Sequence, residues 1–244
     1  PGSANCGPGK LLSKLLSSLP FEMTAAQSRC VDEIRSDLGS PKPMNRLLQG
    51  DVGSGKTLVA VCAILLAVEA GSEAVLMAPT QILAEQHHAV LSQWLEPLGI
   101  NVGLCTAKKK TGSDLPLFEQ NSPGVIVGTH ALLYDSSNIE NLGLVVIDEQ
   151  HKFGVSQRQK LINKGSCPDV LVMTATPIPR TLTLTVYGDL DVSIIDELPP
   201  GRGKINTYVR QSKKHLSDSI KFLKTKLGEG RQAYIVYPLI EDSE

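Results

Sequence analysis

The sequence lacks a surplus of charge: its 244 residues include 24 basic and 25 acidic side chains, for a formal net charge of −1. So balanced a chain has no overall attraction to nucleic acid or to a membrane surface, and any site for a polyanion must be a local patch. It also lacks an apolar run long enough to span a bilayer, and no signal peptide is visible. Because 41% of its residues are hydrophobic, the chain can still form a full globular core.

Cysteines in a Cys-x-x-Cys spacing are absent as well. An odd number of five cysteines without that spacing argues against a disulfide or zinc framework. We interpret them as buried thiols of a protein from a reducing compartment. They are Cys6, Cys30, Cys62, Cys105 and Cys167.

What the sequence does contain is a complete phosphate-binding motif, Gly-x4-Gly-Lys-[Ser/Thr]. In such a loop, successive backbone N–H groups and the N-terminus of the following helix face one anion. Lys56 would reach the β- and γ-phosphates of a nucleoside triphosphate, and the Thr57 hydroxyl would ligate Mg²⁺. A chance glycine-rich turn is the alternative, but the strand-like run before the motif and the helix-like run after it argue against that. The motif comprises Gly50, Asp51, Val52, Gly53, Ser54, Gly55, Lys56 and Thr57.

Strand-like and helix-like segments alternate along most of the chain. Continuous apolar strands between amphipathic helices predict an α/β fold, a doubly wound, mostly parallel sheet with helices on both faces. The expected strands are 44–49, 74–78, 102–106, 124–128, 142–148 and 169–174. The expected helices are 24–38, 58–70, 81–94, 156–164 and 180–187.

Both ends of the chain depart from this pattern. Leucines at helical spacing from Leu11 to Leu16 predict a short amphipathic helix, and a part of the protein outside this chain is one candidate for its docking surface. Because Pro1-Gly2-Ser3 resembles an expression scar, we expect an excised fragment. A Pro/Gly-rich stretch near 198–203 predicts an interdomain linker. A second α/β unit would begin after it, with a strand at 205–210, a helix at 214–227 and a strand at 233–237.

A second chemical motif is the pair Asp148-Glu149 at the end of an apolar strand. Doubly wound sheets bind ligands at the carboxyl ends of their strands, so Asp148 is placed to hold Mg²⁺ through its water shell. Glu149 can orient and deprotonate the attacking water. The alternative is that these acids only cap a following helix. The phosphate motif about a hundred residues upstream favours the catalytic interpretation.

The segment Asp148-Glu149-Gln150-His151, with the tail Lys152-Phe-Gly-Val-Ser-Gln-Arg158, resembles motif II of superfamily 2 helicases in the form carried by RecG-type DNA helicases. Gln150 and this tail favour that type over the transcription-repair translocases, and the tail argues against RNA helicases. Further motifs of the family follow one another in order. They match Phe21, Thr24 and Gln27 (adenine reading), Thr80 (motif Ia), Gly128, Thr129 and His130 (motif Ib), and Thr174, Thr176 and Arg180 (motif III).

The resemblance implies a RecA-like P-loop NTPase lobe at 19–197, preceded by an N-terminal segment 1–18 and followed at 198–244 by a linker and the truncated start of a second such lobe. It implies an ATP- and Mg²⁺-dependent DNA helicase or translocase that acts on forks and junctions, and we expect a monomer. Without the second lobe the chain would bind nucleotide but hydrolyse it weakly. The alternatives are another superfamily 2 DNA translocase, or a nucleotide-dependent switch that unwinds nothing.

The resemblance also assigns roles to the matched residues. Lys56, Asp148, Glu149 and His151 would be catalytic, and Gln27 would hydrogen-bond to the adenine edge. Groups after strand ends, namely Thr80, Gly128, Thr129 and His130, would hold the DNA backbone without reading its sequence. Thr174, Thr176 and Arg180 would couple the γ-phosphate to bound DNA. From the residues themselves, we expect the basic run Lys108-Lys109-Lys110 to be a solvated surface, with a DNA contact as the alternative, and Trp94 to be core packing.

Overall fold

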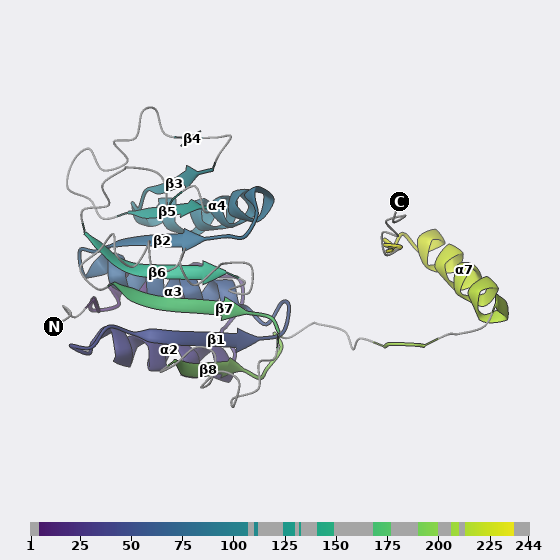
Figure 1. The fold of residues 1–244 in the computed structure, drawn as a ribbon, viewed down its shortest axis with the longest axis horizontal. Helices are drawn as coiled ribbons and strands as arrows, with labels where there is room; N and C mark the ends of the chain where they lie inside the picture. The colour runs from purple at the N-terminus through teal and green to yellow at the C-terminus, as the bar shows by residue number, and fades with distance from the viewer. Residues whose placement is uncertain are drawn as a thin grey trace, which may run out of the picture. The chain divides into compact units, whose positions relative to one another are not determined.

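Figure 1 shows the computed structural model of the chain, which describes residues 5–106, 110–111, 124–129, 132, 141–148, 168–176, 190–199, 206–209 and 213–236. By contacts, the chain divides into two compact units, Pro1–Gly201 and Arg202–Glu244. The functional division expected at residues 18/19 and 197/198 stays a prediction.

The first unit is built on one sheet. Its eight strands among the described residues lie in the order β4-β3-β5-β2-β6-β7-β1-β8. Seven of these strands run parallel, and only β4 pairs antiparallel, with β3 (Figure 1). The strands are β1 (Asn45–Gly50), β2 (Glu73–Met77), β3 (Val102–Cys105), β4 (Lys110–Thr111), β5 (Val125–Gly128), β6 (Leu142–Asp148), β7 (Asp169–Thr174) and β8 (Asp191–Ile195).

The predicted fold class is confirmed, and all six predicted strands of the first unit are present within a residue or two of their expected bounds. The strands β2, β5, β6 and β7 are largely apolar and nearly fully buried, as strands of a covered parallel sheet should be. In β1, by contrast, Asn45 is exposed and only Leu47 and Leu48 are apolar. The two edge strands, β4 and β8, were not predicted. In β8, buried and exposed residues alternate, so it lacks the continuous apolar run of β2, β5, β6 and β7.

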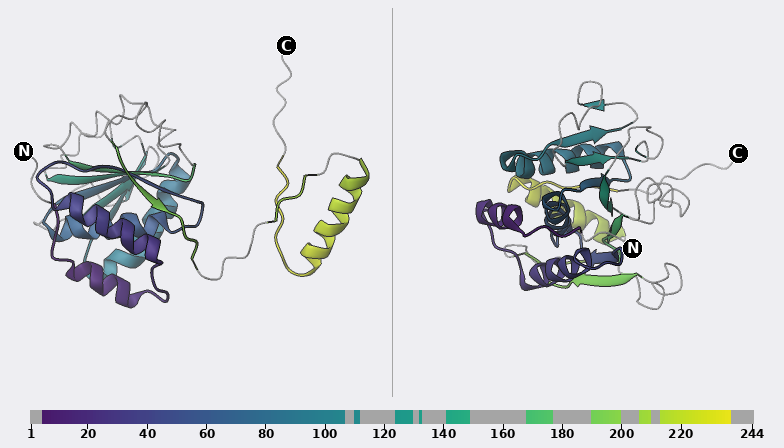
Figure 2. Two further views of the ribbon diagram at one scale, coloured as in Figure 1. Left: turned by 90° about the horizontal axis from the view of Figure 1, so that it is seen from below. Right: turned by 90° about the vertical axis from the view of Figure 1, so that its left-hand side faces the viewer.

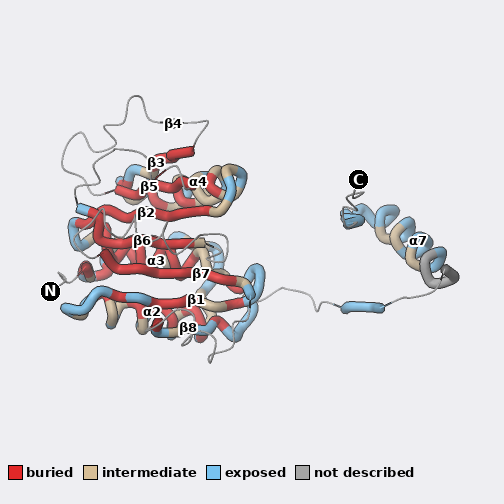
Figure 3. The backbone as a smooth tube through the Cα atoms, in the orientation of Figure 1, coloured by how far each residue is buried: buried red, intermediate tan, exposed pale blue. Residues whose placement is uncertain are grey.

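Four helices of the first unit cover the same face of the sheet (Figure 2). The central one, α3, has eleven buried residues among its fourteen, because other helices and the sheet surround it (Figure 3). The helices are α1 (Lys10–Ser18), α2 (Ala25–Leu38), α3 (Lys56–Glu69) and α4 (Gln81–Leu95), and the 3₁₀ helix η1 (Glu96–Leu98) follows α4. Those at 24–38, 58–70 and 81–94 were therefore predicted correctly.

The opposite face of the sheet is also apolar and buried. Side chains that alternate with those facing the helices, such as Leu47, Val75 and Val145, form a second hydrophobic cluster there. Leu132 belongs to the same cluster. The helices predicted at 156–164 and 180–187 lie outside the described residues.

Helix α1 docks within this chain, which corrects the suggestion that its docking surface lies outside it. Leu12 and Leu15 are buried in the core cluster that contains α3. The Glu69 carboxylate, at the end of α3, accepts hydrogen bonds from the backbone N–H groups of Gly9, Lys10 and Leu11. A carboxylate at this position satisfies N–H groups that have no partner within the helix and complements the helix dipole.

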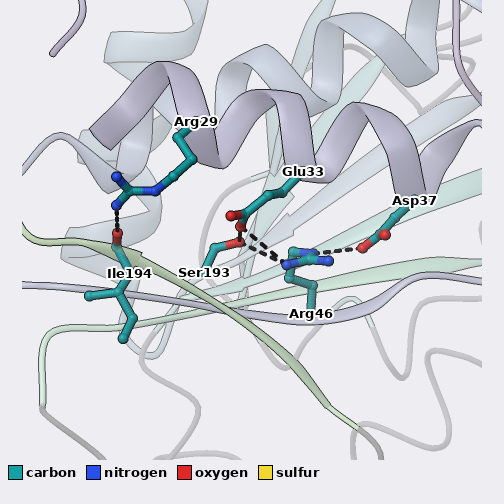
Figure 4. Close-up of polar contacts among 6 residues, drawn as sticks. All are labelled: Arg29, Glu33, Asp37, Arg46, Ser193 and Ile194. Carbon is teal, nitrogen blue, oxygen red and sulfur yellow. Dashed lines mark hydrogen bonds and ion pairs between the residues drawn. The ribbon is translucent and has the colours of Figure 1, made fainter. Parts of the chain in front are cut away.

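A charged network fastens α2 to the sheet (Figure 4). Arg46 of β1 donates to Asp37 over 2.6 Å and lies 3.4 Å from the Glu33 carboxylate. It also donates to the Ser193 hydroxyl of β8 over 2.9 Å, and that hydroxyl donates to Glu33. Arg29, one helical turn before Glu33, bonds the carbonyl of Ile194. The edge strand β8 is thus held by side chains from α2 as well as by β1.

The second unit contains helix α7 (Lys213–Gly228), close to the helix predicted at 214–227. The strands predicted at 205–210 and 233–237 are contradicted, because residues 206–209 and 231–236 are not in strands. Tyr208, Val209, Tyr234 and Ile235 are exposed in these segments. Their apolar pattern favours an extended chain, but a strand also needs a hydrogen-bonded neighbour, and none is found among the described residues.

Three of the five cysteines, Cys30, Cys62 and Cys105, are buried, as predicted, and Cys6 is half-buried. Burial raises the pKa of the Cys30 thiol to about 11 and that of Cys62 to about 12, so both remain protonated at neutral pH. Cys167 lies outside the described residues. Over the part of the chain that is described, we find no helix with the length and apolar character of a membrane span.

Candidate nucleotide-binding site

Three adjacent parallel strands end side by side at one edge of the sheet. The order β6-β7-β1 brings Asp148, Thr174 and Gly50 to this edge, since each is the last residue of its strand. The register pairs Asp148 with Met173 and Gln49 with Thr174. Because the carboxyl ends of parallel strands are where doubly wound sheets bind ligands, this edge is the candidate site.

The phosphate motif forms the expected strand–loop–helix. β1 ends at Gly50, and α3 begins at Lys56 after Gly55, its N-cap. Gly53 and Gly55 have φ angles of 76° and 89°, a left-handed conformation that glycine adopts without strain. These two residues turn the loop back over the N-terminus of α3. The predicted context of the motif is therefore present.

Lys56 is held inside its own loop. Its ammonium group donates to the carbonyl oxygens of Gly50 and Asp51, over 2.8 and 3.0 Å. Ser54 N–H donates to the same Asp51 carbonyl over 3.1 Å. The cation therefore lies at the helix N-terminus, where phosphate oxygens could replace the two carbonyls as its partners.

The loop is packed too tightly for side chains at two of its glycines. A Cβ atom on Gly50 would lie 2.5 Å from the Ser54 hydroxyl oxygen. A Cβ atom on Gly55 would lie 2.2 Å from the amide nitrogen of Gln27. The Ser54 hydroxyl is fully buried and has no hydrogen-bond partner among the described residues. A buried polar atom of this kind at a phosphate loop suits a ligand that brings its own acceptor atoms.

Gln27 connects α2 to the phosphate loop. Its amide nitrogen donates to the Ser54 carbonyl over 2.8 Å, and its amide oxygen accepts from the backbone N–H of Thr24 over 2.9 Å. The Thr24 hydroxyl in turn accepts from the Gln27 N–H, which completes a capping box at the start of α2. Gln27, predicted to read adenine, is thus a buried link between the loop and the helix.

A mostly apolar pocket of about 820 Å³ opens beside the loop. It brings together all three residues predicted to read adenine and two residues of the phosphate motif. Trp94 packs against the core, as predicted, and it also lines this pocket. The lining residues are Pro20, Phe21, Glu22, Met23, Thr24, Gln27, Gly55, Thr57, Leu58, Trp94 and Pro199.

Asp148 has a partner that sequence reasoning missed. The Nε2 atom of His87, on α4, lies 2.9 Å from Oδ2 of Asp148. Both side chains are mostly buried, with exposed fractions of 13% for His87 and 14% for Asp148. His87 lies seven residues after Thr80 of motif Ia, but nothing in the sequence separation of His87 and Asp148 predicts their contact.

Comparison with known proteins identifies the family. The family model for DEAD/DEAH box helicases matches residues 24–185, about two thirds of the chain. The chain belongs to the DEAD/DEAH box helicase family.

Individual relatives of this helicase family are similar over nearly the whole chain. The chain is 54% identical to the ATP-dependent DNA helicase RecG of Synechocystis over 239 residues, which cover 97% of this chain and 29% of that protein. It is 52% identical to RecG of Bacillus subtilis, covering 96% of this chain and 34% of that one. A solved structure of RecG bound to a three-way DNA junction superposes with a TM-score of 0.82 at 43% identity, covering 97% of this chain and 33% of that one. The chain thus spans about a third of the length of these relatives.

The helicase residues expected to hold the DNA backbone are placed differently from one another. Thr80 is exposed and caps α4, its hydroxyl accepting from the Leu83 N–H over 3.3 Å. Gly128 and Thr129 are buried at the end of β5, which pairs with β2. At Gly128 a Cβ atom would lie 2.3 Å from the Cys105 carbonyl oxygen, so packing alone requires glycine there. Of these three residues, only Thr80 is exposed to solvent. Their contacts with DNA stay predictions.

The residues expected to couple nucleotide to DNA are partly described. Thr174 is buried and its hydroxyl lies 2.8 Å from that of Thr176, whose N–H also bonds to it over 3.1 Å. These bonds fix the chain as it leaves β7. This strand lies between β6, which ends in Asp148, and β1, which ends in Gly50. Other predicted helicase residues, Glu149, His151, His130 and Arg180, and the basic run at 108–109, lie outside the described residues.

The residues present fit the Mg²⁺–nucleotide that this family uses. Asp148 and Thr57 would offer hard oxygen ligands, as Mg²⁺ prefers. No cluster of three or more potential metal-binding side chains occurs among the described residues. Mg²⁺ in nucleotide sites is held by one or two protein groups, water and the phosphates rather than by a protein cage, so two such residues suffice.

Proposed function

We propose that this chain is the first motor lobe of a RecG-type, ATP-dependent DNA helicase or translocase. It would bind and hydrolyse ATP with Mg²⁺ to drive remodelling of forked or branched DNA in repair and recombination. The observation that carries the proposal is the shared sheet edge, where the strands that lead into the phosphate loop and that end in Asp148 finish together, with an apolar pocket lined by Gly55 and Thr57 of that loop. The relatives named as ATP-dependent DNA helicases support it.

The phosphate loop would bind the triphosphate by exchanging partners. Lys56 would leave the carbonyls of Gly50 and Asp51 for phosphate oxygens, and the N-terminal N–H groups of α3 would donate to the same anion. Thr57 and Asp148 would hold Mg²⁺, mainly through water. The ion would neutralise charge that develops on the phosphoryl oxygens. Glu149 is the proposed base that orients and deprotonates the attacking water.

The apolar pocket would take the adenine base. Phe21 is half exposed at its rim and offers an aromatic face for stacking. The Gln27 amide oxygen accepts from the Thr24 N–H, and one amide hydrogen is donated to the Ser54 carbonyl oxygen. The second amide hydrogen would be donated to the base. In this role Gln27 would sense the base and the phosphate loop together.

The DNA would lie across the ends of β2 and β5. Thr80, exposed at the N-terminus of α4, is the described residue best placed to hold a backbone phosphate. Contacts of this kind position a strand without reading its sequence and weaken strongly with salt. The relative bound to a three-way junction supports a branched substrate. We expect a monomer in the bacterial cytoplasm, at the nucleoid.

Nucleotide binding by the 244-residue chain tests the proposal. Calorimetric titration with ADP and Mg²⁺ should give a measurable dissociation constant, and Lys56→Ala should weaken binding at least a hundredfold. Lys42→Ala is the matched control, because Lys42 is exposed before β1 whereas Lys56 follows it. Equal affinity for the wild type and Lys56→Ala would refute the nucleotide site.

Hydrolysis in the full-length protein separates the remaining alternatives. A RecG-type enzyme should be stimulated by forked DNA and not by RNA, whereas a nucleotide switch should respond to neither. Glu149→Gln should keep nucleotide affinity and abolish turnover, because the amide retains the shape of the side chain without a basic oxygen. Undiminished turnover in this variant would assign the water-activating role to another residue.

A further inference from the structure

The contact between His87 and Asp148 has no part in the mechanism above. His87 lies seven residues after the N-cap of α4, and Asp148 ends β6, so two elements distant in sequence meet at this point. Their 2.9 Å separation is within hydrogen-bonding range. Since both side chains are mostly shielded from solvent, bulk water competes little for the bond.

The chemistry of the two groups fixes the direction of this hydrogen bond. An ionised carboxylate only accepts, so a neutral His87 ring must carry its proton on Nε2 and donate it to Oδ2 of Asp148. One carboxylate oxygen is then anchored to α4. The other, Oδ1, keeps its lone pairs for the water shell of a cation. The bond also restricts rotation of the carboxylate about its terminal torsion, which is otherwise broad.

We infer that His87 is a positioning residue for Asp148, and that it sets the orientation in which this carboxylate meets the hydrated Mg²⁺ of the nucleotide. The inference deepens the proposed function and rests on its assignment of Asp148 to Mg²⁺. Hydrogen-bond partners of metal-binding groups typically contribute about 10- to 100-fold to metal affinity. Substitution of His87 should therefore weaken the metal-dependent part of nucleotide binding and leave the metal-independent part unchanged.

The next residue of the same helix provides a matched control. His88, also on α4, is partly buried, but its Nε2 atom lies 3.3 Å from the Val102 carbonyl oxygen, at the start of β3. Removing His88 removes an imidazole from α4 without touching Asp148. A loss of helix stability or packing should then appear on substitution of either histidine. A loss of carboxylate positioning should appear only on substitution of His87.

The experiment uses the 244-residue chain with ADP, and Mn²⁺ as the paramagnetic probe for the Mg²⁺ site. Calorimetry gives the ADP dissociation constant in EDTA, and electron paramagnetic resonance gives the Mn²⁺ dissociation constant of the ADP complex. His87→Leu should weaken Mn²⁺ binding at least tenfold and leave ADP binding in EDTA within about twofold of wild type. His87→Gln should restore most of the Mn²⁺ affinity, because its amide N–H can donate from nearly the same position as Nε2. His88→Leu should match the wild type.

Each other outcome is decisive. Equal Mn²⁺ affinity in the wild type and His87→Leu overturns the positioning role, as does an equal loss in His87→Leu and His88→Leu. Should His87→Leu fail to fold, His87→Asn replaces it, because the shorter amide cannot reach Asp148; the role is then overturned if Asn and Gln bind Mn²⁺ alike. A wild type that binds ADP no better than Lys56→Ala refutes the nucleotide site itself, and so separates that failure from failure of this inference.

Discussion

Helix α2 carries two polar networks, and only one of them borders space that a ligand could occupy. At its N-terminus, neutral groups link Gln27 to Thr24 and to the Ser54 carbonyl. They lie beside a pocket and beside the buried Ser54 hydroxyl, which has no hydrogen-bond partner in the described part of the chain. Two to three turns further on, Glu33 and Asp37 approach Arg46, a cation with only a tenth of its side chain exposed (Figure 4). The first network borders space for a ligand, whereas the second joins α2, β1 and β8.

This difference separates binding from folding within a single helix. A neutral network with spare hydrogen-bonding capacity can accept a ligand at little cost, because no charge has to be uncovered. A buried cation must keep its carboxylates, since losing one partner leaves a desolvated charge. Substitutions at one end of α2 should therefore change nucleotide affinity, and substitutions at the other should change stability.

The largest expected effect comes from Arg46→Met, which keeps the apolar stem and removes the cation. Two carboxylates and the Ser193 hydroxyl lose their common partner, so the free energy of unfolding should fall by roughly 3 kcal/mol. Urea unfolding of the 244-residue chain measures it. The ADP dissociation constant of the folded variant should stay within twofold of wild type. Arg29→Met, one turn earlier on the same helix, removes a cation whose side chain is half-exposed and should change stability little. A large loss of ADP affinity in Arg46→Met would contradict the proposal that this end of α2 serves stability and not nucleotide binding.

Gln27→Ala should show the opposite pattern. The Ser54 carbonyl loses its donor and the pocket loses the amide, so ADP affinity should fall about tenfold, the equivalent of roughly 1.4 kcal/mol. Stability should fall by about 1 kcal/mol as the capping box is lost. Thr80→Ala is the control, because it removes a comparable cap from α4 away from the pocket. If both variants bind ADP as the wild type does, Gln27 serves only the helix.

A smaller effect is expected from Ser193→Ala. The hydroxyl accepts from Arg46 and donates to Glu33, whose side chain is 37% exposed, so its removal should lower the free energy of unfolding by about 1 kcal/mol. Ser36→Ala, exposed on α2, should have no effect. Thermal unfolding of the two variants side by side makes the comparison. A loss as large as that of Arg46→Met would show that β8, rather than the arginine, holds this network together.

Ser193 also shows where sequence reasoning reached its limit. The central strands and α2, α3 and α4 were predictable because apolar runs and caps such as Thr24 and Thr80 are local signals. β8 is different, since its buried serine and its exposed Ile194 reverse the expected pattern. Ser193 is buried because it serves Arg46 and Glu33, which lie about 150 residues away in sequence.

The candidate site divides in the same way. Gly50 to Thr57 and Asp148 could be predicted because the chemistry requires them in a fixed local order. The contact of His87 with Asp148 could not, because it depends on how α4 packs beside the sheet. Nor could the second use of Gln27 as a donor to the phosphate loop, since a glutamine side chain gives no sign of which carbonyl it will reach.

The smallest expected effect tests whether the two networks are independent. Gln27 lies six residues from Glu33, about 9 Å along the helix at 1.5 Å per residue, and among the described residues it shares no hydrogen-bond partner with Arg46. Effects of substitutions so separated usually add within about 0.5 kcal/mol. The double variant Gln27→Ala/Arg46→Met should therefore show the sum of the two single losses in unfolding free energy, and the ADP affinity of Gln27→Ala alone. Urea unfolding and calorimetry on the four proteins of this cycle give both coupling energies. A coupling energy above about 1 kcal/mol between the two substitutions in ADP binding would mean that the networks are not independent. Helix α2 would then transmit strain from the β8 side to the phosphate loop.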